Sequence, residues 1–128
     1  MNDDLQEIAS ATRHWVYAPY SNFLVGEALL SASGRIFAGS NVENVSLGLT
    51  LCAERVCVGM AVAQEERHFK TITTVADSRV PIVPCGACRQ VLAEFAPRLR
   101  IVTLTITYAR SEFMLQELLP FPKQGILE

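Results

Sequence analysis

Two short cysteine-containing segments hold the residues best suited to chemistry. Cys52 precedes Glu54 in Cys52-Ala53-Glu54-Arg55, and Cys85 and Cys88 are three positions apart in Pro84-Cys85-Gly86-Ala87-Cys88-Arg89-Gln90. Each segment begins a stretch whose composition predicts a helix, and the unpaired N–H groups and dipole of a helix start favour anions. Such a position favours the thiolate, which is the form of cysteine that binds metals.

Three thiolates brought into one small volume would repel one another unless a cation neutralised them, and Zn²⁺ suits sulfur ligands. Three protein ligands is the number typical of catalytic zinc, which keeps its fourth position for water, whereas structural zinc is closed by four. Zinc lowers the pKa of such a water toward about 7 and so supplies a nucleophile at neutral pH. We therefore predict a catalytic Zn²⁺ held by Cys52, Cys85 and Cys88.

Two charged residues beside these cysteines have predicted roles. Glu54 lies two residues from Cys52 on the same predicted turn, so its carboxylate would reach the zinc water without binding the metal. It is predicted to take the proton of that water and deliver it to a ring nitrogen and then to a leaving amine. Three thiolates and Zn²⁺ carry a net charge of about −1, which weakens the metal as a Lewis acid. Arg55 is favoured over Arg89 to offset that charge by donating hydrogen bonds to sulfur.

Two other interpretations of the cysteines remain open on spacing alone. Cys85 and Cys88 before a helix also fit a thioredoxin-like redox pair, which would need neither Cys52 nor Glu54. A structural zinc site would need a fourth ligand, and Cys57 is the only cysteine left. Cys57 lies five residues past Cys52, about 140° round a helix, and it is predicted to be a buried core thiol.

The elements that must position these residues follow from hydrophobic spacing and from Gly and Pro breaks. Helices are predicted over residues 3–17, 53–65, 86–95 and 114–119, and strands over 23–31, 35–42, 71–76 and 100–108. Ser33-Gly34 predicts a hairpin turn between the first two strands. Trp15 is predicted to anchor the core or an interface. This alternation of strands and helices favours a layered α/β sandwich in which helices cover a mixed sheet.

Length and charge limit the number of domains and the kinds of partner. The 128 residues, half of them hydrophobic, fit a single domain over residues 1–128. A net charge of −2 and a pI near 5.7 argue against a nucleic-acid partner, which usually meets a basic stripe. No stretch approaches the roughly 18 apolar residues of a membrane span, and Met1-Asn2-Asp3-Asp4 lacks a signal-peptide start. We therefore expect a cytoplasmic protein that contacts no membrane.

Several motifs in the same order resemble the small cytidine deaminase family over nearly the whole chain. They are the two cysteine segments, Tyr20-Ser21-Asn22-Phe23-Leu24-Val25-Gly26, Gly39-Ser40-Asn41-Val42-Glu43-Asn44 and Glu117-Leu118-Leu119-Pro120. The resemblance implies an α/β three-layer sandwich with a mixed five-stranded sheet covered by helices. It also implies zinc-dependent hydrolysis of cytidine or 2′-deoxycytidine to uridine or 2′-deoxyuridine plus ammonia, in pyrimidine salvage.

Further roles follow from the resemblance by position. Asn41 and Glu43 would bind the ribose hydroxyls, chiefly the 3′-OH, Phe23 would pack against the nucleoside, and the backbone near Ala53 would help to read the base. Taken alone, Asn41 and Glu43 would fit turn residues after a strand equally well, and Phe23 would fit a core residue. The family's small members are usually tetramers whose neighbours complete each active site, so a homo-oligomer is expected, a tetramer before a dimer.

Two departures from the family pattern concern the assembly and the substrate. Leu47 stands where the family often has Tyr at a subunit interface. After Leu119-Pro120 the chain reads Phe121-Pro122-Lys123-Gln124-Gly125-Ile126, where many members have an aromatic residue followed by Gly-Pro. A modified cytosine nucleoside is therefore the alternative substrate, since a related branch of the family deaminates blasticidin S.

Overall fold

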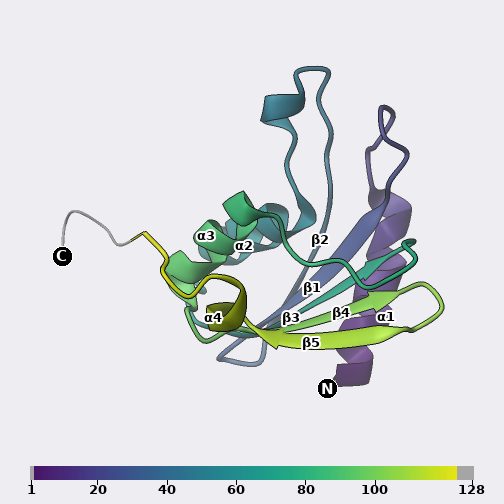
Figure 1. Cartoon of the computed structure of the whole chain (residues 1–128). Coiled ribbons are helices and arrows are strands. Elements are labelled where there is room, and N and C mark those ends of the chain that lie inside the picture. Colours follow the sequence, from purple (N-terminus) through teal and green to yellow (C-terminus); the bar gives the residue numbers. More distant parts are fainter. Residues whose placement is uncertain (1, 124–128) are drawn as a thin grey trace.

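The chain forms one mixed five-stranded sheet with helices on both faces (Figure 1). The computed structural model describes residues 2–123, so the tail residues Gln124-Gly125-Ile126 lie outside the described part. The strands, in the spatial order β2-β1-β3-β4-β5, are β1 (Val25–Ser31), β2 (Ile36–Ser40), β3 (Phe69–Ala76), β4 (Arg100–Thr105) and β5 (Arg110–Met114). Only β3 and β4 are parallel to each other. The predicted α/β sandwich is confirmed, and so is the mixed five-stranded sheet.

The helices divide between the two faces of this sheet. They are α1 (Asn2–Thr12), α2 (Ala53–Ala63), α3 (Gly86–Phe95) and α4 (Leu115–Leu118), with two 3₁₀ turns, η1 (Arg13–Trp15) and η2 (Leu47–Leu49). A buried cluster that includes Leu5, Ala28 and Val102 joins α1 to one face. A second cluster, with Leu29, Val58 and Leu92, joins α2 and α3 to the other. Within the described residues, every helix is too short or too polar to pass through a membrane.

Several predicted boundaries hold, and others shift for physical reasons. The predicted helix over 86–95 matches α3, and Ser33-Gly34 does form the turn between β1 and β2, with Gly34 at a φ of +97°. The strand predicted over 100–108 ends at Thr105, because Tyr108 adopts a φ of +67° in the turn that follows. The residue pattern missed β5, whose Arg110, Ser111 and Glu112 look like a loop but form an edge strand paired with β4.

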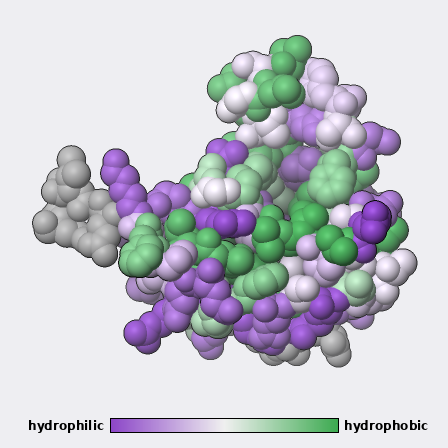
Figure 2. All heavy atoms as spheres, viewed as in Figure 1, coloured by the Kyte–Doolittle hydropathy of each residue, from purple (hydrophilic) through white to green (hydrophobic). Residues whose placement is uncertain are grey.

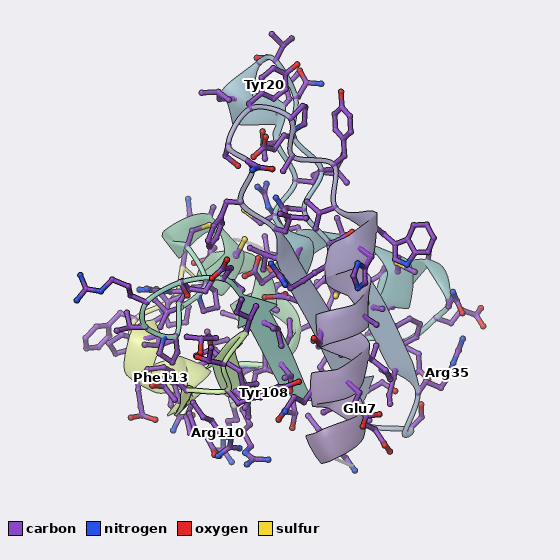
Figure 3. The ribbon with its side chains drawn as sticks, turned by 90° about the vertical axis from the view of Figure 1, so that its right-hand side faces the viewer. Glu7, Tyr20, Arg35, Tyr108, Arg110 and Phe113 are labelled. Carbon is purple, nitrogen blue, oxygen red and sulfur yellow. The ribbon has the colours of Figure 1, made fainter. Side chains whose placement is uncertain are left out.

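A projecting arm extends beyond the end of the sheet. We define it as residues 16–23 and 42–51, which are tied together by β-bridges from Val42 to Tyr17 and to Leu51. Val45, Leu47 and Leu49 are strongly exposed there, and Figure 2 shows apolar side chains at the tip of the projection. Figure 3 places Tyr20 on the arm, at the opposite end of the molecule from Arg110.

Candidate metal centre and active site

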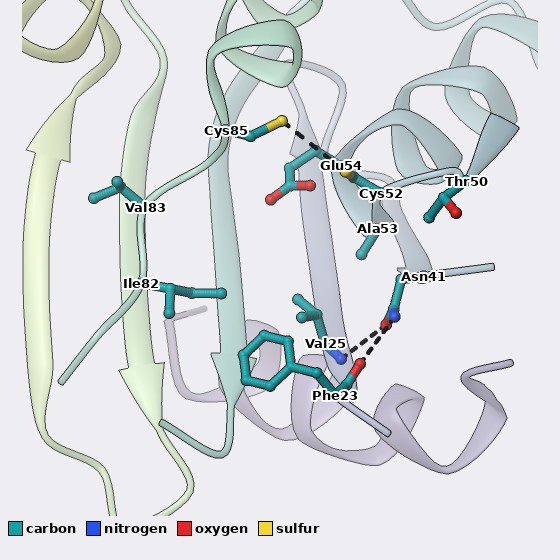
Figure 4. A pocket seen from close by; sticks show the side chains of 10 residues that line it. All are labelled: Phe23, Val25, Asn41, Thr50, Cys52, Ala53, Glu54, Ile82, Val83 and Cys85. Carbon is teal, nitrogen blue, oxygen red and sulfur yellow. Dashed lines mark hydrogen bonds between the residues drawn. The ribbon is translucent and has the colours of Figure 1, made fainter. Parts of the chain in front are cut away.

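The three cysteines meet where two helices begin on the same face of the sheet. Cys52 is the N-cap residue of α2 and Cys85 is the N-cap residue of α3, while Cys88 lies in the first turn of α3. All three Sγ atoms lie within 4.8 Å of one another. The Sγ atoms of Cys52 and Cys85 are 4.0 Å apart (Figure 4). Packing α2 and α3 side by side therefore assembles the cluster that the sequence predicts.

The spacing of these sulfurs fits a tetrahedral zinc ion. With Zn–S bonds of about 2.3 Å, the sulfurs of a tetrahedral site lie roughly 3.8 Å apart. The observed separations of up to 4.8 Å need only small side-chain adjustments to reach that value. The cluster contains no fourth protein ligand among the described residues, and this leaves one coordination position for a small molecule, as catalytic zinc requires.

The remaining cysteine lies apart from the cluster. Cys57 is fully buried, and its Sγ contacts the backbone carbonyl oxygen of Glu27 at 3.8 Å. Burial, followed by the charges of Glu27 and Glu54, raises the pKa of Cys57 well above its usual range. The predicted core role of Cys57 is confirmed. A four-cysteine structural zinc site is not formed by the described residues, because Cys57 is not part of the cluster.

The electrostatics of the cluster suit a bound cation. Burial would raise the pKa of Cys85, but hydrogen bonds from the Cys88 backbone N–H, from Cys88 and from Cys52 together lower it. Burial and the nearby Glu54 charge raise the pKa of Cys88. One sulfur therefore favours the thiolate while its neighbour keeps a proton that a metal would displace.

Arg55 is the arginine that contacts sulfur. Its Nη2 donates to the carbonyl oxygen of Thr50 at 3.1 Å and to Sγ of Cys52 at 3.7 Å. Its buried Nε has no hydrogen-bond acceptor among the described residues. Arg89 instead donates to the carbonyl oxygens of Pro84 and Leu118, at 2.8 and 3.2 Å. The contact agrees with the predicted choice of Arg55, whose effect on zinc charge stays a prediction.

A cavity of about 220 Å³ opens beside the cysteines. Glu54 is only 6% exposed and lines this cavity from the first turn of α2, next to Cys52 and Ala53. Figure 4 shows its carboxyl group below the two sulfurs of Cys52 and Cys85 and facing the cavity. The full lining is Phe23, Val25, Asn41, Thr50, Cys52, Ala53, Glu54, Ile82, Val83 and Cys85. A carboxyl group, a sulfur cluster and an aromatic ring thus share one small cavity.

Asn41 closes the far side of the cavity and also holds the chain together. Its side-chain carbonyl accepts from the Val25 backbone N–H at 2.9 Å, and its amide donates to the Phe23 carbonyl oxygen at 2.9 Å (Figure 4). Each amide group has further hydrogen-bonding capacity. Asn41 therefore links the start of β1 to the end of β2, and it also lines the cavity.

Glu43 is the predicted substrate residue that does not line the cavity. It lies on the arm, where its carboxylate accepts from the backbone N–H groups of Tyr20 and Ser21, at 3.0 and 3.1 Å, and from the Ser21 hydroxyl. The hydrogen bond from the Ser21 hydroxyl lowers the pKa of Glu43. In this chain Glu43 therefore orders residues 20–21 of the arm, and its contact with a ribose stays a prediction.

The sequence pattern missed one buried acid. Glu27 lies in the middle of β1 with no exposed surface, and the Thr74 hydroxyl donates to its Oε1 at 2.6 Å. Its other oxygen, Oε2, has no donor among the described residues. Nothing in the local sequence marks Glu27, because a single acid between apolar residues of a strand reads as a position facing water.

Comparison with known proteins decides the family. The model of the cytidine and deoxycytidylate deaminase zinc-binding region matches residues 1–105. The chain belongs to the cytidine deaminase family. A cytidine deaminase of Halalkalibacterium halodurans is 48% identical over 89 residues, which are 70% of this chain and 67% of that protein. One of Sporosarcina psychrophila is 51% identical over 83 residues, which are 65% of this chain and 61% of that protein.

A solved structure extends the likeness to the full fold. The crystal structure of cytidine deaminase from Burkholderia pseudomallei superposes with a TM-score of 0.93 at 42% identity, covering 96% of this chain and 99% of that one. The aligned segment spans only 61% of the length of the Sporosarcina protein. The chain is thus a zinc-binding deaminase domain, and Zn²⁺ is the metal that its cysteine cluster fits.

Proposed function

We propose that this protein hydrolyses cytidine and 2′-deoxycytidine to uridine and 2′-deoxyuridine, releasing ammonia. The observation that carries the proposal is that Glu54, Cys52 and Cys85 line one small cavity, with Cys88 completing the sulfur cluster behind it. Relatives that bear the name cytidine deaminase and share 48% and 51% identity support it further. A redox pair would leave both Glu54 and Cys52 without a role, so the geometry favours the deaminase.

The residues of the sulfur cluster and its surroundings have distinct roles in this reaction. Cys52, Cys85 and Cys88 hold Zn²⁺, which when bound makes a water nucleophilic near neutral pH. Glu54 would take a proton from the attacking water and pass it to the ring nitrogen of the base. It would then take the proton of the new hydroxyl group on C4 and give it to the departing amine, so that the carbonyl forms as ammonia leaves. Arg55 offsets part of the negative charge of the cluster by donating a hydrogen bond to the Cys52 sulfur.

The residues on the wall of the cavity opposite the cysteines orient the substrate. Phe23 is 37% exposed and offers its ring to the nucleoside, while the backbone at Ala53 lies beside the base. Asn41 can use its remaining hydrogen-bonding capacity for the ribose 3′-OH. Glu43 holds residues 20–21 through its carboxylate, which keeps a further acceptor site for a ribose hydroxyl.

The proposal also covers the oligomeric state of the protein and its cellular compartment. Exposed Val45, Leu47 and Leu49 at the tip of the arm support a homo-oligomer, with a tetramer favoured over a dimer. The four free cysteines support a reducing compartment, the cytoplasm, where the reaction serves pyrimidine salvage. Light scattering coupled to gel filtration measures the assembly directly, and a monomer at micromolar concentration would contradict it.

The first experiment follows the loss of ultraviolet absorbance when the zinc-loaded protein meets cytidine, 2′-deoxycytidine or blasticidin S. We expect turnover of the two simple nucleosides. Turnover of blasticidin S alone would identify a modified cytosine nucleoside as the substrate. No turnover together with a reversible Cys85–Cys88 disulfide would favour the redox interpretation.

The second experiment removes the proton carrier. Glu54→Gln should keep its zinc and lose about 10²- to 10⁴-fold in kcat, which is the usual share of general acid–base catalysis. Glu94→Gln is the matched control, because Glu94 is exposed on α3 and away from the cavity lining. Full activity of Glu54→Gln would disprove the assigned role.

A further inference from the structure

Glu27 is a buried carboxyl group that the proposed reaction does not use. It lies in a polar row across the sheet, paired with Gly39 of β2 on one side and with Thr74 of β3 on the other, and Thr74 pairs in turn with Thr103 of β4. Towards Leu29 and Ile72 the same face becomes an apolar cluster. A polar row in an otherwise apolar layer costs stability unless its atoms are hydrogen-bonded, so its presence needs an explanation.

The surroundings of Glu27 are those of a neutral acid. Its side chain has no exposed surface, and no lysine or arginine is among the groups that shift its pKa. The ionisable groups that face it are Glu54, Cys52 and Cys57, all from α2. Burial first, then the charge of Glu54 and a hydrogen bond to it, raise the pKa of Glu27 well above its usual range. Burial without a neighbouring cation therefore favours the protonated carboxylic acid over the carboxylate.

A neutral acid has one proton to donate, and only one of its oxygens lacks a partner. Oε1 accepts from the Thr74 hydroxyl at 2.6 Å, which leaves the proton on Oε2. Oε2 is fully buried and has no hydrogen-bond donor among the described residues. After burial, Glu54 is the group that most raises the pKa of Glu27, through its charge and a hydrogen bond between the two side chains. A carboxylate accepts a stronger hydrogen bond than a neutral oxygen does.

We propose that Glu27 is a positioning residue for Glu54, whose carboxylate it holds in place by donating a hydrogen bond from a protonated Oε2. The proton stays on Glu27 throughout, and no bond to it is made or broken in the reaction. The Thr74 hydroxyl fixes the other oxygen, so the chain Thr74–Glu27–Glu54 runs from the centre of the sheet to the cavity. The inference rests on the proposed function, because it assigns Glu27 a purpose in the same site.

Orientation is the property that Glu54 needs from its surroundings. Its carboxyl group ends a flexible side chain on the first turn of α2, beside the Cys52 ligand. A misplacement of about 1 Å in a group that transfers a proton can cost roughly 10²-fold in rate. A fixed donor behind the carboxylate keeps one oxygen turned away and leaves the other facing the cavity.

Two substitutions of Glu27 separate the effect of its hydrogen-bond donor from the effect of its buried side-chain volume. Glu27→Gln keeps an oxygen that accepts from Thr74 and an amide that donates to Glu54, so kcat should stay close to that of the wild type. Glu27→Leu fills the same space with no donor, and kcat should fall by about 10²-fold while KM and zinc content change little. Thr74→Val removes the support of Glu27 from a second position, with an intermediate loss of kcat expected.

A readout that needs no substrate completes the test. The infrared difference spectrum between the wild type and Glu27→Gln should contain the C=O stretch of a protonated carboxyl group at neutral pH. That band should shift in Glu54→Gln, because its acceptor has changed. Zinc-loaded and zinc-free protein are both measured.

Each outcome decides the proposal. Wild-type kcat in Glu27→Leu would overturn it, and so would a Glu27→Gln variant as slow as Glu27→Leu, because the neutral amide would then be no substitute. The absence of the protonated C=O band would overturn it independently of any assay. If the wild type turns over neither nucleoside but shows the band and its shift in Glu54→Gln, the proposed function fails while the Glu27–Glu54 hydrogen bond stands.

Discussion

The two faces of the sheet are built differently, although each is covered by helices. The face under α1 holds the apolar residues Leu30, Val75 and Leu104 from three neighbouring strands. Its buried polar residues in β3 are two threonines, Thr71 and Thr73, and it buries no carboxyl group among the described residues. The face under α2 and α3 combines an apolar half around Leu29 and Ile72 with the polar row of Glu27, Thr74 and Thr103. Both faces belong to the same strands, so alternate residues of one strand meet these different environments.

The difference shows where the fold gives up apolar packing. Among the described residues, the buried carboxyl groups Glu27 and Glu54 both lie on the face where α2 begins, whereas the buried polar residues of β3 under α1 are threonines. One feature is nevertheless shared, because a glycine lets a helix backbone touch the sheet on each face. A Cβ atom on Gly26 would lie 1.9 Å from the Ala9 carbonyl oxygen of α1, and one on Gly39 would lie 2.8 Å from the Ala53 carbonyl oxygen of α2.

The sharpest test of the contrast compares two buried cysteines on the same face. Cys88→Ala should lose zinc and with it all measurable turnover, because only two thiolates remain in the cluster. Cys57→Ala should keep stoichiometric zinc and lose about 1 kcal/mol of unfolding free energy. Metal analysis and urea unfolding check both, and zinc loss in Cys57→Ala would mean that Cys57 contributes to the metal site.

The next test compares two buried leucines on opposite faces. Leu5 of α1 and Leu92 of α3 are both fully buried. Leu5→Ala and Leu92→Ala should each lower the unfolding free energy by about 2–5 kcal/mol, because both leave a cavity. Leu92→Ala should also weaken zinc affinity, since α3 carries Cys88 and begins after Cys85. Leu5→Ala should bind zinc as tightly as the wild type. Equal loss of affinity in the two variants would show that the faces are not independent.

The smallest effects come from the two contact glycines. Gly26→Ala and Gly39→Ala should each cost about 1–3 kcal/mol of unfolding free energy, because the added methyl group meets backbone atoms. Only Gly39→Ala should also lower kcat, because the added methyl group would displace the first turn of α2, which carries Glu54. Gly59→Ala is the control, since its Cβ would meet nothing and Ala favours a helix. Unchanged kcat in Gly39→Ala would argue against this coupling.

Much of the site could be predicted from the sequence because its residues lie close together along the chain. Cys52 and Glu54 share one turn, and Cys85 and Cys88 share another, so spacing alone indicates their chemistry. Glu27 could not be found this way. Its burial depends on Thr74 in the neighbouring strand and on α2 above it, contacts that only the folded chain brings together.

The difference between local signals and contacts made only in the folded chain also explains which elements of the fold could be predicted. The bounds of α3 follow from local signals, with Pro84 before it and Pro97 after it. Strand β5 gives no local signal, because its polar residues are held by pairing with β4 at the edge of the sheet. Trp15 was expected to anchor the core or an interface. It is 80% exposed, so the core alternative is wrong and the interface alternative stays a prediction. Large aromatic residues are often buried, but a 3₁₀ turn after α1 carries this one outward.

The meeting of two helix starts at one sulfur cluster has a thermodynamic consequence. A ligand that binds the folded chain and not the unfolded chain stabilises the fold by mass action. Cys52 and Cys85 lie 33 positions apart, so the unfolded chain presents them together only rarely. Above the dissociation constant, each tenfold rise in free zinc should therefore add about 1.4 kcal/mol to the unfolding free energy. The melting temperature of this protein becomes a gauge of the zinc available to it.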